Sequence, residues 1–155
     1  MLEIKRLDHF GLVAGVIKDL GLIELIDKHF EYDESEHIST GEAVAGMIIN
    51  GLGFTQLPMS LTPKFFENKP LEILFREGVE ASHFNRFKLG RSLDDIYEYG
   101  VEALFSEIAL KVCKKEGIKI DLSHLDTTTF SLTGQYLPDT DENEIRITYG
   151  YSKDH

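Results

Sequence analysis

The sequence has little cysteine, no tryptophan, four prolines and no long apolar run. Its one cysteine, Cys113, cannot form an internal disulfide, which fits a reducing compartment. No window reaches the roughly 18 consecutive apolar residues that a membrane span requires. The first ten residues also lack the apolar core and cleavage site of a signal peptide. We therefore expect a cytoplasmic protein with no membrane partner.

Basic residues are also scarce, with 16 lysines and arginines against 27 acidic residues and a net charge of -11. Phosphate contacts require clustered basic side chains, so the composition alone argues against a nucleic-acid-binding surface. Arg86, Lys88 and Arg91 form a compact basic group without acids between them. These three are the candidate nucleic-acid-binding residues, and the alternative is an ordinary solvated helix end.

Helical periodicity runs through the first 116 residues. Apolar positions three and four apart predict two helices, over 8–20 and 22–29, that meet at Gly21. This pair is either a core hairpin or a helix-turn-helix-like pair. Ser39 opens the sequence S-T-G-E, a capping box that predicts a helix over 40–52. That helix is apolar on most sides, so we expect it at the centre of the domain.

Further helices are predicted between the central helix and residue 116. Pro63 and Pro70 mark the first turns of two short helices. Ser82 and Ser92 are predicted to be the N-caps of two more, divided by Gly90. The last helix ends before Gly117, and its apolar stripe consists of Val101, Leu104, Phe105, Ile108, Ala109 and Val112.

The period changes after Gly117. Apolar and polar residues alternate over 118–122, β-branched residues fill 127–133, and a third candidate strand covers 145–151. The predicted fold class is therefore mainly α followed by a short β segment. We expect a helical N-terminal domain at 1–116 and a separate segment at 117–155, which is too short to bury a core alone.

Asp126 is the residue of this second segment that suggests chemistry. It follows a predicted strand and precedes three threonines, which places a carboxylate where Mg²⁺ could bind. A strand-end aspartate that caps a turn is the alternative. His124 lies two residues earlier, so a free-standing metal-dependent hydrolase built on His124 and Asp126 is a further hypothesis. Two-metal phosphoryl transfer needs more carboxylates than this one.

Four segments together resemble a known family. They are L-D-H-F-G-L-V-A-G-V-I-K-D-L-G-L at 7–22, L-G-R-S-L-D-D-I-Y-E-Y-G at 89–100, H-L-D-T-T-T-F-S-L-T-G at 124–134 and I-T-Y-G-Y-S-K-D-H at 147–155. This combination is similar to insertion-sequence transposases of the DDE class, in the group with a helical N-terminal domain of unknown function ahead of an RNase H-like core. The likeness extends over nearly the whole chain.

The resemblance implies a function and its limits. Residues 117–155 would be the opening strands of an incomplete RNase H-like core, and Asp126 would be both its first catalytic and its first metal-binding residue. The family's second Asp and its Glu lie further downstream, and no late acid of this chain matches them. DNA, and Mg²⁺ or Mn²⁺, would then bind to the complete protein, and we expect no tightly bound metal here.

Two functions follow as expectations. The first is an N-terminal transposase fragment that is inactive alone but belongs to a protein that moves DNA by metal-dependent phosphoryl transfer. The alternative is a non-catalytic interaction or oligomerisation module that regulates or inhibits full-length transposase. Its partner would be full-length transposase or a second copy of the chain.

Overall fold

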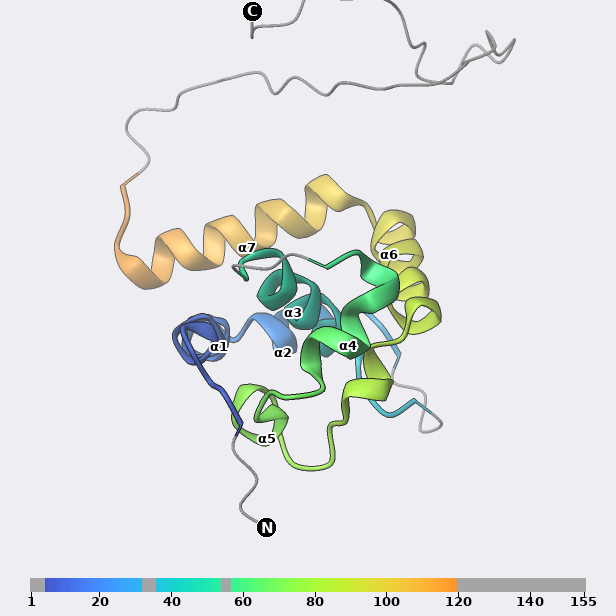
Figure 1. Ribbon diagram of the computed structural model, residues 1–155. Coiled ribbons are helices and arrows are strands. Elements are labelled where there is room, and N and C mark those ends of the chain that lie inside the picture. Colours follow the sequence, from blue (N-terminus) through green and yellow to red (C-terminus); the bar gives the residue numbers. More distant parts are fainter. Residues whose placement is uncertain (1–4, 32–35, 54–56, 120–155) are drawn as a thin grey trace, which may run out of the picture. The chain divides into compact units, whose positions relative to one another are not determined.

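The computed structural model describes residues 5–31, 36–53 and 57–119, and every regular element in these ranges is helical. The chain divides into two units, residues 1–119 and 120–155. None of the described helices has both the length and the apolar character needed to cross a bilayer. The elements (Figure 1) are α1 (Phe10–Leu20), α2 (Leu22–Asp27), α3 (Thr40–Gly51), η1 (Met59–Leu61), α4 (Thr62–Phe66), α5 (Leu71–Leu74), η2 (Ala81–Phe84), α6 (Arg86–Tyr99) and α7 (Val101–Glu116).

Helix α3 lies in the middle of the other helices, as its apolar sequence predicts (Figure 1). It contacts α1, α2, α4 and α6. Ala43, Ala45 and Ile49 are at most 1% exposed. The Ser39 capping box forms as predicted, so α3 begins at the expected residue. The predicted pair before it also forms, because Gly21 takes a left-handed conformation (φ 59°, ψ 44°) that ends α1 and begins α2.

The core beside α3 is built from aromatic rings. Phe66 and Phe84 are at most 1% exposed, and their ring centroids are 4.6 Å apart. Phe75 lies 4.9 Å from Phe84 by the same measure. Gly46 of α3 lets the Phe84 ring approach the helix backbone, since a Cβ at Gly46 would lie 2.5 Å from that ring. The position therefore needs glycine for packing rather than for backbone freedom.

Helix α6 corrects the prediction of two helices that start at Ser82 and Ser92. One helix runs through Gly90, and its N-cap is Asn85, whose side-chain oxygen accepts hydrogen bonds from the backbone N–H groups of Phe87 and Lys88. Ser82 lies in η2 instead. Ser92 is a fully buried residue within α6. A serine suits a cap by type, but here tertiary packing decides its position.

The predicted fold class, mainly α followed by a short β segment, was wrong: the described residues are all helical and hold no strand. At Ile118, where the first strand was expected, the backbone N–H donates to the Cys113 carbonyl (2.9 Å) and so completes the end of α7. A strand also needs a hydrogen-bonded neighbour, and alternation in a sequence does not supply one. The other positions assigned to the expected RNase H-like strands, from residue 120 onward, lie outside the described residues.

The packing of Phe84 on Gly46 gives a stability prediction. Gly46→Ala should lower the free energy of unfolding by about 1–3 kcal/mol, because the ring or the helix must move to make room. Gly51→Ala is the matched control at the exposed end of the same helix, where a Cβ meets nothing within 4 Å. That control should be neutral or stabilising by up to about 1 kcal/mol. Urea unfolding measures both, and equal stability of the two variants would contradict this packing.

Candidate functional site

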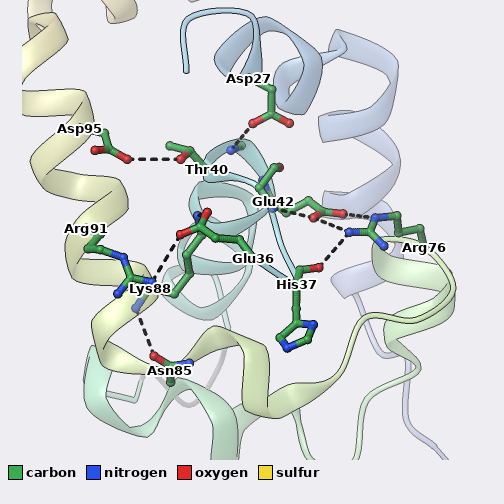
Figure 2. Close-up of polar contacts among 12 residues, drawn as sticks. Asp27, Glu36, His37, Thr40, Glu42, Arg76, Asn85, Lys88, Arg91 and Asp95 are labelled. Carbon is green, nitrogen blue, oxygen red and sulfur yellow. Dashed lines mark hydrogen bonds and ion pairs between the residues drawn. The ribbon is translucent and has the colours of Figure 1, made fainter. Parts of the chain in front are cut away.

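A polar network surrounds the first turn of α3 (Figure 2). Glu42 is 5% exposed and accepts three hydrogen bonds. The Ser39 backbone N–H donates to its Oε2 (2.9 Å), Arg76 Nε donates to Oε1 (2.6 Å), and Arg76 Nη2 donates to Oε2 (3.0 Å). Arg76 also donates to the carbonyl of His37 (3.0 Å). A buried carboxylate needs such compensation, so Glu42 caps α3 and fastens the Arg76 segment to it.

Two aspartates connect the same turn to neighbouring helices. The Gly41 backbone N–H donates to Asp27 Oδ1 (2.6 Å), which ties the end of α2 to the start of α3. The approach is so close that a Cβ at Gly41 would lie 2.5 Å from the carbonyl oxygen of Ile23. Thr40 Oγ1 donates to Asp95 Oδ2 of α6 across a longer 3.5 Å. Negative charge beside a helix N-terminus is favourable, so both carboxylates stabilise α3 where they lie.

Glu36 joins the network to two of the predicted nucleic-acid-binding residues (Figure 2). Its carboxylate forms an ion pair with Lys88, whose side chain is 7% exposed, and with Arg91 Nη2 (3.3 Å). Arg86, the third predicted residue, lies over the Phe87 ring with its guanidinium carbon 4.7 Å from the centroid. A phosphate would have to displace Glu36 to reach Lys88. Nucleic-acid binding by these residues stays a prediction. Of the three, exposed Arg86 could contact a phosphate without displacing Glu36.

Two hollows border Glu36. One has a volume of about 590 Å³ and is lined by carboxylates such as Glu24, Asp27 and Glu31 together with Arg76. The other, of about 840 Å³, is lined by Lys88, Arg91 and the stacked rings of His37 and His83, whose centroids are 4.4 Å apart. Burial, and then the charge of His37, lower the pKa of His83. Within the described ranges no group of three or more His, Cys, Asp or Glu side chains could hold a metal ion.

A second polar cluster holds α7 against α2. Glu107 accepts hydrogen bonds from Lys28 Nζ (2.7 Å) and the Tyr99 hydroxyl (2.9 Å), and His29 Nε2 lies 3.1 Å away. These contacts, with that of Lys28 the largest, lower the pKa of Glu107 to about 2. The same bond to Glu107 raises the pKa of Tyr99. No sequence pattern indicated this cluster, because Lys28 and Glu107 are 79 positions apart.

The residues expected to carry chemistry, His124 and Asp126, lie outside the described residues. Three of the carboxylates near the start of α3 are each committed to an ion pair or a backbone N–H: Glu36, Glu42 and Asp27. Their arrangement fastens helices to one another. Capping-box spacing revealed Glu42, whereas nothing in the sequence revealed its partner Arg76, 34 positions later.

The lowered pKa of Glu107 predicts an acid-dependent loss of stability. Ionised Glu107 stabilises the folded state, because its pKa is lower there than in the unfolded chain. This stabilisation is complete at pH values above the ordinary carboxyl pKa of 4.5, and it is lost as the pH falls toward about 2. Unfolding by urea at a series of pH values across this window should therefore show a steeper acid slope in the parent than in Glu107→Gln. Lys28→Met removes the largest cause and should flatten the slope as well. Identical slopes in all three proteins would contradict the assigned contacts.

Comparison with known proteins identifies the family of the helical part. A family model described as a domain of unknown function (DUF4277) matches residues 2–110. No curated protein matches the chain, and no solved structure does. The matched residues include α1 to α6 and most of α7, which are the helices that form around α3. Because the match extends over more than half of the chain, this protein belongs to the DUF4277 family of domains of unknown function.

Proposed function

We propose that this chain is the N-terminal part of a DDE-class transposase, in which the helical domain is the non-catalytic part. The observation that carries the proposal is the order of two features in one chain. A helical domain of the DUF4277 family occupies residues 2–110, and H-L-D-T-T follows at 124–128. The resembled transposases have this order. In the complete protein, Asp126 would be the first of the carboxylates that bind Mg²⁺ or Mn²⁺ for phosphoryl transfer on DNA.

The described helices support a structural role within that protein. Their buried carboxylate, Glu42, is saturated by Ser39 and Arg76, and Glu36 is engaged by Lys88 and Arg91. The chain carries a net charge of -11, which repels a phosphate backbone unless a basic surface elsewhere compensates. DNA contacts in the complete protein would then depend on residues beyond this network. A cytoplasmic location for this protein stays a prediction from its sequence.

A second candidate function is an interaction module that regulates full-length transposase without cutting DNA. The observation that favours it is the exposure of large apolar side chains on one side of α7, where Val101 is 50% exposed and Phe105, one turn later, is 69% exposed. Exposed aromatic and aliphatic side chains gathered on one element are typical of surfaces that bind other proteins. Both candidates assign the described helices a non-catalytic role, so activity of the isolated chain tests them together.

We expect the isolated chain to neither cleave nor join DNA with Mg²⁺ or Mn²⁺. Asp126 alone cannot hold the two ions that in-line phosphoryl transfer requires. The assay is nicking and strand transfer on supercoiled DNA, with Asp126→Asn as the matched variant. Metal-dependent cleavage by the parent that disappears in Asp126→Asn would contradict the proposal that this part is inactive alone.

A second experiment tests the transposase assignment itself. The coding DNA directly after His155 should supply a further Asp and a Glu, and the protein extended by that stretch should cleave DNA with Mg²⁺. Asp126→Asn should abolish the activity of the extended protein, whereas Asp121→Asn leaves the expected first carboxylate in place. Cleavage that survives Asp126→Asn would overturn the role proposed for Asp126.

A further inference from the structure

Two histidines from distant parts of the sequence stack on each other. His37 belongs to the segment before α3, and His83 lies in η2. Their ring centroids are 4.4 Å apart and their planes differ by 14°. His37 is exposed and His83 is half-buried, so a ring that leaves the stack can turn into solvent. We call this pair the histidine clasp, because it joins the segment before α3 to η2.

The backbone on both sides of the histidine clasp is held in place. Ile38, next to His37, is 1% exposed, and Phe84, next to His83, is 0% exposed. Arg76 also donates to the His37 carbonyl (3.0 Å; Figure 2). Repulsion between the two rings is therefore relieved more readily by rotation of a side chain than by a shift of either backbone.

One nitrogen of His83 has a fixed role. Nδ1 accepts a hydrogen bond from the Glu80 backbone N–H (3.1 Å), and this contact caps η2. A backbone N–H can only donate, so Nδ1 must carry a lone pair and the neutral ring must carry its proton on Nε2. An imidazolium has a proton on both nitrogens, so a protonated His83 would point one N–H at another. The capping contact therefore requires the neutral form of His83.

The surroundings of His83 oppose its protonation. Burial is the largest cause of its lowered pKa, and the charge of His37 is the second. Glu80 raises the pKa, Arg76 lowers it, and Glu42 raises it, in decreasing order of effect. The net direction is downward from the ordinary histidine value of 6.5. The ring of His37 is thus both the stacking partner of His83 and a source of repulsion once charged.

The hollow beside the two rings supplies little compensation for a charged His83. Glu36, Lys88 and Arg91 also line this hollow, and the Glu36 carboxylate already forms ion pairs with both cations. Glu80 lines it as well but is exposed, and water weakens the attraction of an exposed carboxylate for the ring. Protonated His83 therefore gains most by leaving the stack for solvent.

We propose that the histidine clasp opens in acid: when His83 binds a proton, its ring leaves His37 and releases the Glu80 N–H. The chemical change is the transfer of one proton from solvent to Nδ1. Opening removes the wall that the two rings form in the hollow lined by Lys88 and Arg91. The inference concerns the helical domain alone and needs no DNA, so it does not depend on the transposase assignment.

Acid should weaken the clasp rather than strengthen it. Well above pH 6.5, the ordinary histidine pKa, His83 is neutral in both the folded and the unfolded chain. As the pH falls below this value, the unfolded chain binds the proton first, and the folded state loses stability relative to it. The clasp is therefore closed at neutral pH and opens as the pH falls below 6.5 toward the lower pKa of the folded protein.

Nuclear magnetic resonance of the full chain tests the tautomer and the titration. At neutral pH the ring nitrogen signals of His83 should show the proton on Nε2, and the ring should titrate below pH 6.5. The Glu80 amide signal should shift with the same midpoint, because its acceptor is lost. The Phe87 amide is the matched control, since it donates to the side-chain oxygen of Asn85 (3.1 Å), which does not titrate. A ring that titrates at or above 6.5, or that carries its neutral-form proton on Nδ1, would overturn the proposal.

Contacts between the two rings test the opening itself. Nuclear Overhauser effects between ring protons of His37 and His83 should be present above the His83 midpoint and lost below it. Rings that stay in contact throughout the titration would mean that the clasp remains closed in acid, which would contradict the proposal.

Two variants separate the charge of the rings from their packing. His83→Asn keeps an oxygen that can accept from the Glu80 N–H but does not titrate between about pH 5 and 8. Urea unfolding should show a smaller loss of stability in acid for this variant than for the parent. His37→Phe keeps a ring in the stack but removes its charge, so the pKa of His83 should rise.

Equal acid losses in the parent and His83→Asn, or an unchanged pKa of His83 in His37→Phe, would overturn the proposal. If a variant fails to fold, the titration and ring contacts of the parent still decide the question. None of these measurements involves DNA cleavage, so failure of the clasp and failure of the transposase assignment are distinguishable.

Discussion

The described fold depends on hydrogen bonds that neutralise the charge of one buried carboxylate. Glu42 lies in the first turn of the central helix and is 5% exposed, so its charge must be matched inside the protein. Ser39 supplies one hydrogen bond and Arg76 supplies two. Because Arg76 also donates to the His37 carbonyl, one guanidinium holds the start of α3, the segment before it and the loop after α5 in a fixed relation.

Other contacts of α3 depend on this first turn of the helix being formed. Asp27 binds the Gly41 N–H only if the first turn of α3 is in place, and Thr40 reaches Asp95 of α6 from the same turn. One turn further along, Gly46 accepts the Phe84 ring, which brings the aromatic core to the helix. The polar network and the apolar core are thus connected through a single helix. This arrangement suits a module that must be rigid, and the described carboxylates are used for that rigidity.

The sequence predicted the features that depend on neighbours along the chain. Ser39 and Glu42 are three positions apart, so their capping box is visible in the sequence, and Gly21 and Gly117 mark helix ends for the same local reason. The partners of these groups are not local: Arg76 is 34 positions from Glu42, and Glu107 is 79 from Lys28. No periodicity could show them.

Ser92 and Ile118 show two further limits of local patterns. Ser92 has the residue type of an N-cap, but the packing of α6 buries it in mid-helix. Alternation from Ile118 suggested a strand, whereas its N–H closes α7. The candidate site was predicted in part: Lys88 and Arg91 were singled out for their charge, and Glu36, which engages both, was missed. The stripe of α7 was read from its period, which does not show that Leu104 is buried while Phe105 is 69% exposed.

A double-mutant cycle between Glu42 and Arg76 tests the central claim most directly. Glu42→Gln retains a side chain that can cap α3, and Arg76→Met retains most of the packing of the arginine stem. Urea unfolding of the parent, both single variants and the double variant should give a coupling of about 1–3 kcal/mol. The exposed pair Lys5–Glu72, 3.5 Å apart, is the matched control and should give less than about 0.5 kcal/mol. A Glu42–Arg76 coupling as small as that of the control would contradict the role assigned to Glu42.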